Sequence, residues 1–223
     1  MFCFFSVILF SYLLGSISFS YLIAKKIKKI DIRSQGSGNA GATNTLRVLG
    51  VGPAVTVLLL DVAKGVLPIV VAMLISDEPL VHVAAGLGAI IGHNWPVYFG
   101  FRGGKGVATS IGVMATLLLL PALAAGIIAI GSIVMTRYVS LGSLLFAILT
   151  PIAALLFMIM PSFTYPLEYI FLSIFLAIMS VWRHRTNVSR LLSGTESKLG
   201  KKTCIRRRYV EKERCCNWRW KLG

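Results

Sequence analysis

The sequence predicts an all-α integral membrane protein with about seven transmembrane helices. Hydrophobic residues make up 56% of the 223 residues, and the mean hydropathy of +0.79 exceeds what soluble domains show. The apolar residues form runs long enough to cross a bilayer. Lysines and arginines, which give a net charge of +15, cluster beside these runs, as is typical of the cytoplasmic flanks of membrane helices. Lipid headgroups and phosphate account for this charge, so we expect no nucleic-acid partner.

The first apolar run, Phe2 to Ala24, ends at a cluster of lysines between positions 25 and 29. Because basic residues stay on the cytoplasmic side, this cluster places the N-terminus outside the cell and the end of the run inside. The run has no basic segment before it and no clear cleavage site of small residues. We therefore expect a retained first span rather than a signal peptide that is removed.

Two further spans are expected before the middle of the chain. Val51 to Ile75 runs outward, Ser76 to Pro79 forms an external turn, and Leu80 to Phe99 returns to the cytoplasm. Asp61 and Lys64 lie inside the second span, three residues apart. Ionisable residues within a membrane are candidates for function, but this close spacing favours a structural ion pair.

The stretch from Val107 to Thr136 is too long for one straight span. As a single helix it would measure about 45 Å, against about 30 Å of hydrocarbon, and Pro121 near its middle favours a break. Two short helices leave Arg137 in the cytoplasm, after which Val139 to Met160 runs outward and Leu167 to Val181 returns. The C-terminus is then cytoplasmic. A model with five or six helices stays open, and a single crossing here would leave the last polar segment outside.

Three polar segments interrupt these spans, and they carry the chemistry. They read GSGNAGATNTLR from Gly36, GHNWPVYFGFRGGKGVATS from Gly92 and WRHRTNVSRLLSGTE from Trp182. Small residues, amides, hydroxyls and cations recur in all three, which is the composition of a phosphate site. The seven-helix arrangement brings them to the cytoplasmic end together, so we expect one anion site at the membrane surface.

The glycines of the first segment allow positive φ, so that successive backbone amides can face an anion. A helix is expected to begin near Ala42, where its N-terminal end favours a bound phosphate, and Arg47 lies about one turn further on. A flexible loop between spans explains the same composition equally well. No Gly-Lys-Ser/Thr follows the glycines, so the segment is not a Walker loop. Side-chain donors come from Ser37, Asn39, Thr43 and Asn44.

The second segment displays Lys105 between glycines, which let the backbone approach a ligand while the ammonium acts as a point charge. Val107 is expected to begin a helix with free backbone amides. The positive-inside rule alone explains a lysine here, but the glycines exceed what that rule needs, which favours function. His93 and Asn94 precede the turn, and the histidine is as readily structural as functional. The glycines are Gly103, Gly104 and Gly106.

The third segment places Arg183, His184, Asn187 and Arg190 on one face of a helix that leaves the membrane. A histidine and an amide three residues apart can meet the same substrate group. A basic amphipathic helix lying on anionic lipid explains the arginines but leaves His184 and Asn187 unexplained. The cysteines fit no common zinc spacing, so we expect free thiols and no metal site. They are Cys3, Cys204, Cys215 and Cys216.

Read in order and spacing, GSGNAGATN, GHNWPVYFGFRGGKGVAT and RHRTNVSRLLSGTE resemble the three cytoplasmic motifs of the bacterial acyl-phosphate:glycerol-3-phosphate acyltransferases, the PlsY family. The resemblance implies transfer of a fatty acyl group from acyl phosphate to the 1-hydroxyl of sn-glycerol 3-phosphate. The products would be lysophosphatidic acid and phosphate, in phospholipid biosynthesis and without a metal or other cofactor. It also implies a bacterial cell membrane enzyme with its active site facing the cytoplasm, and membrane lipid as a partner.

The resemblance covers residues 1–197, the expected membrane-embedded acyltransferase domain, whereas residues 198–223 form a basic cytoplasmic tail that matches nothing in the family. Arg102 departs from the lysine expected at its position. The expected catalytic residues are Ser37, Lys105, His184 and Asn187. The expected substrate-binding residues are Gly38, Asn39, Gly41, Thr43, Asn44, Arg47, His93, Asn94, Gly103, Gly104, Gly106, Arg183 and Arg190.

Two other classes of function compete with this one. A membrane transporter of an organic phosphate would hold its site near the middle of the bilayer on broken helices, whereas these polar segments lie at the ends of spans. A lipid-binding scaffold would need neither Lys105 nor His184. The His-x4-Asp motif of other glycerol-phosphate acyltransferases is absent, because no aspartate lies five residues after any of the 3 histidines. Acyl-chain preference and oligomeric state are left open.

Overall fold

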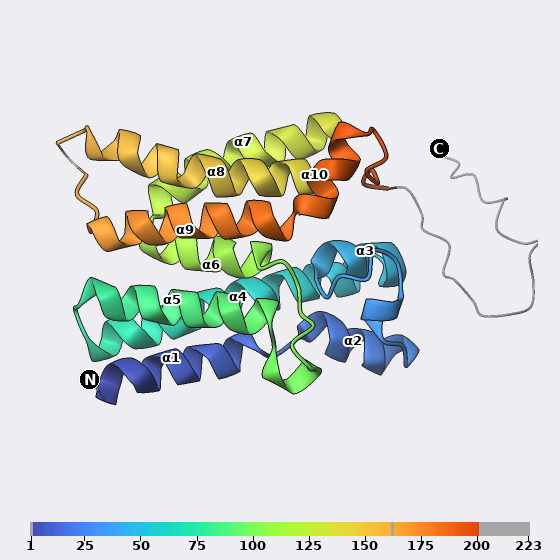
Figure 1. The fold of residues 1–223 in the computed structure, drawn as a ribbon, viewed down its shortest axis with the longest axis horizontal. Helices are drawn as coiled ribbons and strands as arrows, with labels where there is room; N and C mark the ends of the chain where they lie inside the picture. The colour runs from blue at the N-terminus through green and yellow to red at the C-terminus, as the bar shows by residue number, and fades with distance from the viewer. Residues whose placement is uncertain (1, 162, 201–223) are drawn as a thin grey trace, which may run out of the picture.

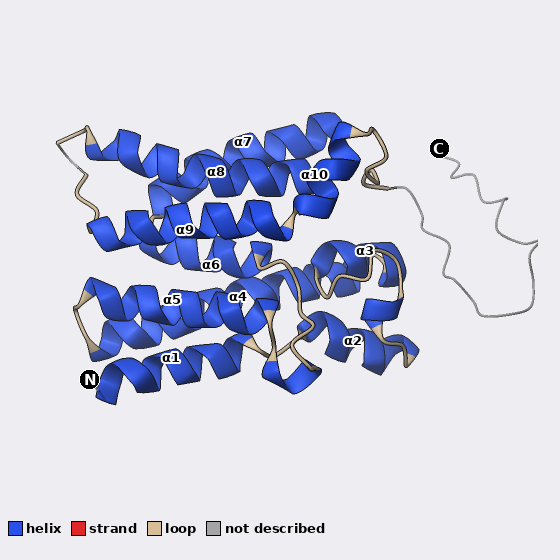
Figure 2. Cartoon of the chain, viewed as in Figure 1, coloured by secondary structure: helices blue, strands red, loops and turns tan. Residues whose placement is uncertain are grey.

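A computed structural model describes residues 2–161 and 163–200, and the regular structure within this part of the chain is helical (Figures 1 and 2). The all-α prediction is therefore confirmed. Single 3-10 turns lie at Ile32–Ser34 and Val97–Phe99. The α-helices are α1 (Phe2–Gly15), α2 (Phe19–Lys28), α3 (Ala42–Leu49), α4 (Val51–Ile75), α5 (Pro79–Asn94), α6 (Val107–Leu117), α7 (Leu119–Thr136), α8 (Val139–Met158), α9 (Leu167–Arg183) and α10 (Arg185–Leu192).

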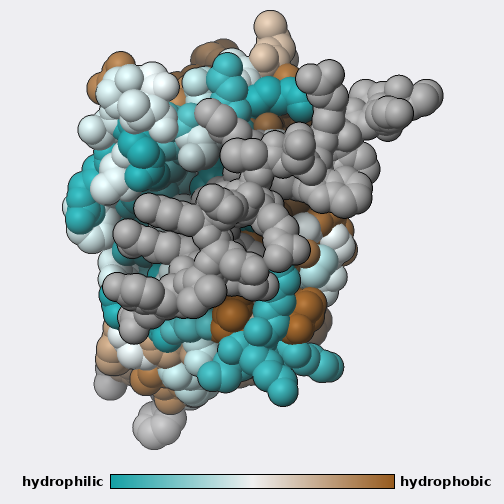
Figure 3. All heavy atoms as spheres, turned by 90° about the vertical axis from the view of Figure 1, so that its right-hand side faces the viewer, coloured by the Kyte–Doolittle hydropathy of each residue, from teal (hydrophilic) through white to brown (hydrophobic). Residues whose placement is uncertain are grey.

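The long helices lie side by side in one bundle, and the chain runs up and down along it (Figure 1). Helices α1, α4 and α5 form one side of the bundle, helices α7, α8 and α9 form the other, and α6 lies between them. All three polar segments, together with α2, α3 and α10, lie at one end, on the right in Figure 1. Figure 3 looks at that end and shows hydrophilic residues gathered over it.

The bundle has the lengths and surfaces of a membrane protein. Within the part of the chain that the structure describes, four helical stretches are long and apolar enough to cross a bilayer: Phe4–Lys28, Val51–Ile75, Leu119–Thr136 and Val139–Met158. The bent pair of α9 and α10 gives a fifth. Large apolar side chains, such as Leu74 and Met135 at 82% and 86% exposure, point outward, as contact with lipid requires. The count of seven spans and the orientation of the termini stay predictions, because α6 covers only about 16 Å.

Two predicted helix boundaries were wrong, and the first predicted span consists of two helices. The long stretch does break, but at Leu118 rather than at Pro121. Pro121 lies in the first turn of α7, where backbone N–H groups make no bond within the helix, so its missing N–H costs nothing there. The first span is interrupted between Gly15 and Phe19 before it continues to Lys28. The third predicted span ends at Asn94, five residues early, because the chain turns there into the second polar segment.

Glycines bring neighbouring helices into backbone contact. A Cβ added to Gly65 of α4 would overlap the carbonyl oxygen of Thr109 on α6, and one added to Gly112 of α6 would overlap that of Val62 on α4. Such close approach at small residues is how membrane helices pack. It sets the axial position of each helix, and with it the position of the polar segment at its end.

Candidate active site

The three polar segments are bound to one another, although they are far apart in the sequence. The Lys105 ammonium donates to the Asn187 side-chain oxygen, and the Arg183 guanidinium donates to the Gly104 carbonyl. These bonds join the second segment to the third. Arg33, three residues before the first segment, donates to the carbonyl of Phe99 over 2.7 Å, and Arg47, the last residue of the first segment, donates over 3.4 Å to the carbonyl of Ser197, directly after the third segment.

The first segment is a turn held by a buried amide. Gly36 and Gly38 have φ of 58° and 74°, values that an L side chain rarely adopts. The Asn44 side chain accepts from the Ser37 backbone N–H over 2.8 Å, and its NH2 group donates to the carbonyls of residues 32 and 35. The Asn44 side chain thus bonds the backbone of the turn at three places, while Ser37 is exposed at the tip of the turn.

Helix α3 begins at Ala42 with Gly41 as its N-cap, which confirms the predicted helix start. Asn39 and Thr43 flank this start and are half-buried. Arg47, in the last turn of α3, interacts electrostatically with Glu196 and Arg190 of the third segment. The first segment therefore contributes one arginine to the place where the other two segments meet.

The second segment contains a tight turn in which Gly103 and Gly104 leave no room for a side chain. The Gly104 N–H donates to the His93 carbonyl over 3.1 Å, and an added Cβ at Gly104 would overlap Nε2 of His93. At Gly103 an added Cβ would overlap the His93 carbonyl oxygen. Gly106, at φ 82°, caps α6, which begins at Val107 as predicted. This packing holds the half-buried Lys105 at the start of α6.

The Asn94 side chain packs between this turn and the interior of the bundle. It is fully buried, and its NH2 group contacts the Met179 sulfur at 3.8 Å. A Cβ added to Gly106 would come within 2.9 Å of its side-chain oxygen. The contact of Asn94 with substrate, expected from the sequence, stays a prediction.

The third segment is bent rather than being a single helix. Helices α9 and α10 meet at 62°, with His184 at the junction, so the prediction of one continuous helical face was wrong. Nδ1 of His184 lies 2.8 Å from the Ser180 carbonyl. A carbonyl only accepts, so Nδ1 carries the hydrogen and the Nε2 lone pair is free. Burial, together with the nearby charge of Lys105, lowers the pKa of His184 to about 4, which keeps the ring neutral at pH 7.

A buried carboxylate, that of Glu196, organises the third segment. It accepts hydrogen bonds from Asn187 at 2.7 Å, Arg190 at 2.7 Å and Ser140 at 3.0 Å. Burial acts to raise the pKa of Glu196, but the hydrogen bonds from these three donors hold it below its usual value. Glu196 was not among the predicted site residues. An acidic residue that closes a basic segment is a weak signal, and its burial depends on the α8 contact.

The assembled site is cationic. Burial and the neighbouring arginines, Arg190 foremost, lower the pKa of Lys105 to about 8, so the ammonium is mostly protonated at pH 7. Four cations thus face one carboxylate, a balance that favours anionic ligands. They are Arg47, Lys105, Arg183 and Arg190. In residues 2–161 and 163–200 no group of three His, Cys, Asp or Glu side chains is arranged to hold a metal ion.

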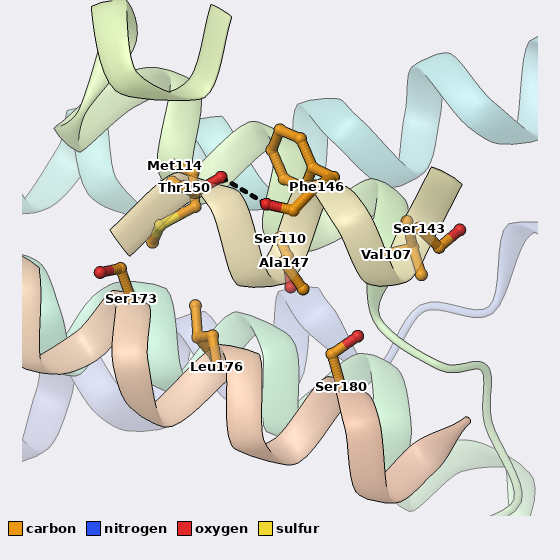
Figure 4. A pocket seen from close by; sticks show the side chains of 10 residues that line it. All are labelled: Val107, Ser110, Met114, Ser143, Phe146, Ala147, Thr150, Ser173, Leu176 and Ser180. Atoms are coloured by element: carbon orange, nitrogen blue, oxygen red, sulfur yellow. Dashed lines mark hydrogen bonds between the residues drawn. The ribbon is translucent and has the colours of Figure 1, made fainter. Parts of the chain in front are cut away.

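A narrow crevice lies inside the bundle between α6, α8 and α9 (Figure 4). Two of its lining residues are near the site residues in the chain: Val107, two residues after Lys105, and Ser180, whose carbonyl holds His184. Along α9, Ser180, Leu176 and Ser173 face α8 in Figure 4. The crevice thus lies between helices whose ends adjoin Lys105 and His184. Its lining is Val107, Ser110, Met114, Ser143, Phe146, Ala147, Thr150, Ser173, Leu176 and Ser180.

The fold and the site define a multi-pass membrane protein with a cluster of cations at one end of its helical bundle. The family model described as glycerol-3-phosphate acyltransferase matches residues 5–194, and the chain belongs to this family. It is 73% identical over 199 residues to the glycerol-3-phosphate acyltransferase of Shouchella clausii, covering 88% of this chain and 96% of the relative. It is also 66% identical to the glycerol-3-phosphate acyltransferase of Halalkalibacterium halodurans, covering 86% of this chain and 93% of the relative.

Solved structures agree with this assignment. The chain resembles PlsY (YgiH), an integral membrane glycerol 3-phosphate acyltransferase, in its glycerol 3-phosphate form, with a TM-score of 0.80 and 39% identity over 88% of this chain and 96% of that one. The lysophosphatidic acid form of PlsY gives a TM-score of 0.77 and 38% identity over 88% and 95%. The chain is therefore a multi-pass membrane acyltransferase of phospholipid biosynthesis.

Proposed function

We propose that the protein transfers a fatty acyl group from acyl phosphate to the 1-hydroxyl of sn-glycerol 3-phosphate, releasing lysophosphatidic acid and inorganic phosphate. The observation that carries the proposal is the cationic cluster, where side chains of the three segments meet at one end of the bundle. Both substrates carry phosphate, and the donor also carries an acyl chain. The solved PlsY structures are forms with glycerol 3-phosphate and with lysophosphatidic acid, which supports the same substrate and product here.

We infer direct attack by the glycerol hydroxyl on the acyl carbon. Acyl phosphate is a mixed anhydride, so its phosphate is already a good leaving group and no covalent enzyme intermediate is needed. The sequence has no Gly-x-Ser-x-Gly motif that would present a serine nucleophile. The protein then acts by positioning the two substrates and by stabilising the charge that develops between them.

In this mechanism Lys105 and the backbone amides at the start of α6 neutralise the acyl-phosphate head and the developing oxyanion. The first segment, with Ser37 and Arg47, holds glycerol 3-phosphate. His184 presents a free Nε2 that can accept the hydroxyl proton, and bound phosphate would raise its low pKa. The phosphate of the donor is the alternative proton acceptor, in which case His184 positions the hydroxyl.

The orientation of the protein in the membrane follows from the basic residues at the end of the bundle that carries the polar segments. The lysines at positions 25 to 29 lie on the side of the polar segments, and basic residues favour the cytoplasm. We infer a bacterial cell membrane protein whose active site faces the cytoplasm. Because the polar segments lie at an end of the bundle and not at its middle, the arrangement disfavours a transporter of organic phosphate.

A phosphate-release assay tests the proposal. Purified protein in detergent is given acyl phosphate and glycerol 3-phosphate, and release is expected only when both are present, with lysophosphatidic acid found by mass spectrometry. Acyl-CoA or acyl carrier protein as donor is expected to give no product. Folded protein that releases no phosphate above the rate of spontaneous hydrolysis would rule the proposal out.

A further inference from the structure

A cluster of ionisable side chains lies inside the bundle, behind the candidate active site. Asp61 and Lys64 of α4 are each 2% exposed and form an ion pair of 2.9 Å, which confirms the predicted pair. The Lys64 ammonium also donates to the Ile17 carbonyl over 2.7 Å, at the break between α1 and α2. His93 of α5 is buried beside them, with Nδ1 3.6 Å from the Asp61 carboxylate.

Pairing alone does not account for the histidine. Burying charges within a membrane is costly unless they are paired, and Asp61 and Lys64 already satisfy one another. Nδ1 of His93 lies beyond hydrogen-bonding distance of the carboxylate and is buried without another partner. The imidazole therefore contributes little to the pairing of the two charges. Its role follows instead from what its other ring nitrogen, Nε2, contacts.

The opposite side of His93 supports the turn that carries Lys105. Nε2 lies directly against Gly104, where no side chain would fit, and the His93 carbonyl accepts from the Gly104 N–H. The Gly104 carbonyl accepts in turn from Arg183. Gly104 is thus held on one side by His93 and on the other by the third segment, and the next residue is Lys105.

We propose that Asp61 and His93 are positioning residues for Lys105. The Asp61 carboxylate, paired with Lys64, lies behind the imidazole at 3.6 Å from Nδ1, and the imidazole sets the position of the Gly104 backbone. The buried His93 then acts without touching substrate, in contrast to the substrate contact expected from the sequence. The inference rests on the proposed function, because it takes Lys105 to face the acyl-phosphate head.

The test compares substitutions of the two buried histidines of α5. His93→Leu is expected to lower kcat per folded enzyme about a hundredfold, the cost of misplacing a catalytic group by about 1 Å, with little change in KM for glycerol 3-phosphate. His93→Gln, whose amide reaches the place of Nε2, is expected to recover part of this loss. The matched control is His82→Leu, since His82 is also buried and bonds Tyr169 and Ser76 at the other end of the helix. The control is expected to lose thermal stability but to keep its kcat.

A second variant protects the test against misfolding. Asp61→Leu with Lys64→Met removes both charges together, so that neither is left unpaired, and it is expected to lower kcat as His93→Leu does. Full kcat in either folded variant overturns the proposal. If neither variant folds, the cluster is a determinant of folding and the positioning role is rejected. Wild-type protein that is inactive with acyl phosphate would instead refute the proposed function, which separates the two failures.

Discussion

At the residue scale, the amide of Asn187 links a cation to a carboxylate. Its oxygen accepts from Lys105 and its NH2 group donates to Glu196. Neither aspartate nor leucine can perform both tasks, because one lacks the donor and the other lacks both groups. The orientation of Asn187, and with it the direction in which Lys105 points, is therefore set by Glu196.

Lys105→Ala is expected to lower kcat by at least about a hundredfold, the typical cost of removing a group that stabilises charge in the transition state. Phosphate release by protein that elutes as a single folded species from gel filtration measures the effect. Lys26→Ala is the control, because Lys26 is an exposed lysine at the same end of the bundle. A Lys105→Ala enzyme with wild-type kcat would refute the catalytic role proposed for this lysine.

The pH dependence of kcat/KM follows from two groups. Lys105 must be protonated, so activity is expected to fall as the pH rises through about 8. If His184 is the base, it must be neutral, so activity falls as the pH drops through about 4. Initial rates, corrected for spontaneous hydrolysis, test both limits. In Lys105→Arg the upper limit should move beyond the measurable range, because a guanidinium stays charged; an unmoved limit would exclude Lys105 as its source.

At the element scale, the site depends on where helices begin and end. Helices α3 and α6 begin beside the pocket, whereas α9 stops at Arg183 so that the chain can bend and bring α10 across it. The backbone contact between α4 and α6 places α6 along the bundle axis. A shift of α6 would carry Lys105 with it, so helix packing and catalysis are coupled through one glycine interface.

Gly112→Ala is expected to destabilise the protein, because the new methyl group overlaps the Val62 carbonyl and the two helices must separate. Overpacking of this kind costs about 1–3 kcal/mol, seen as a lower thermal midpoint in detergent. Gly126→Ala on α7 is the matched control, since its methyl group meets nothing within 4 Å. It should be neutral or stabilising by up to about 1 kcal/mol. Equal midpoints for the two variants would contradict the packing.

At the scale of the whole molecule, all three polar segments lie at one end of the bundle (Figure 1), as expected of seven spans, whereas a single crossing by residues 107–136 would leave the third segment on the other side. Because α5 and α6 are shorter than a usual span, the bilayer must thin or the helices tilt around them. The sidedness of the first and third segments therefore decides between the two topologies. It also decides whether the pocket faces the cytoplasm, where both phosphorylated substrates would be supplied.

Cysteine labelling of intact cells measures this sidedness, after the 4 native cysteines are replaced by serine. With a membrane-impermeant reagent, Ser37→Cys and Ser193→Cys are expected to stay unlabelled until the cells are opened, because both lie at the end of the bundle that we propose faces the cytoplasm. Asp77→Cys, in the turn at the opposite end, should label at once and serves as the positive control. Labelling of Ser193→Cys but not of Ser37→Cys in intact cells would refute the seven-helix topology.

Much of the fold was predictable because its signals are local. Apolar runs located the long helices, and glycine turns followed by helix formers located the starts of α3 and α6. The break in the long stretch was expected, but its position at Leu118 was not, because a proline is tolerated in a first helical turn. The predicted tail could not be assessed beyond residue 200, since residues 201–223 and their three cysteines lie outside the described residues.

By itself the sequence determined the class of protein, the three polar segments and most of the residues that the pocket gathers, because hydropathy, charge and glycine patterns are properties of short stretches of chain. The tertiary structure alone decided the bend at His184, the central place of Glu196 and the contact that runs from Asp61 through His93 to Gly104. These features depend on which distant residues become neighbours when helices pack. A short stretch of sequence does not determine which distant residues these are.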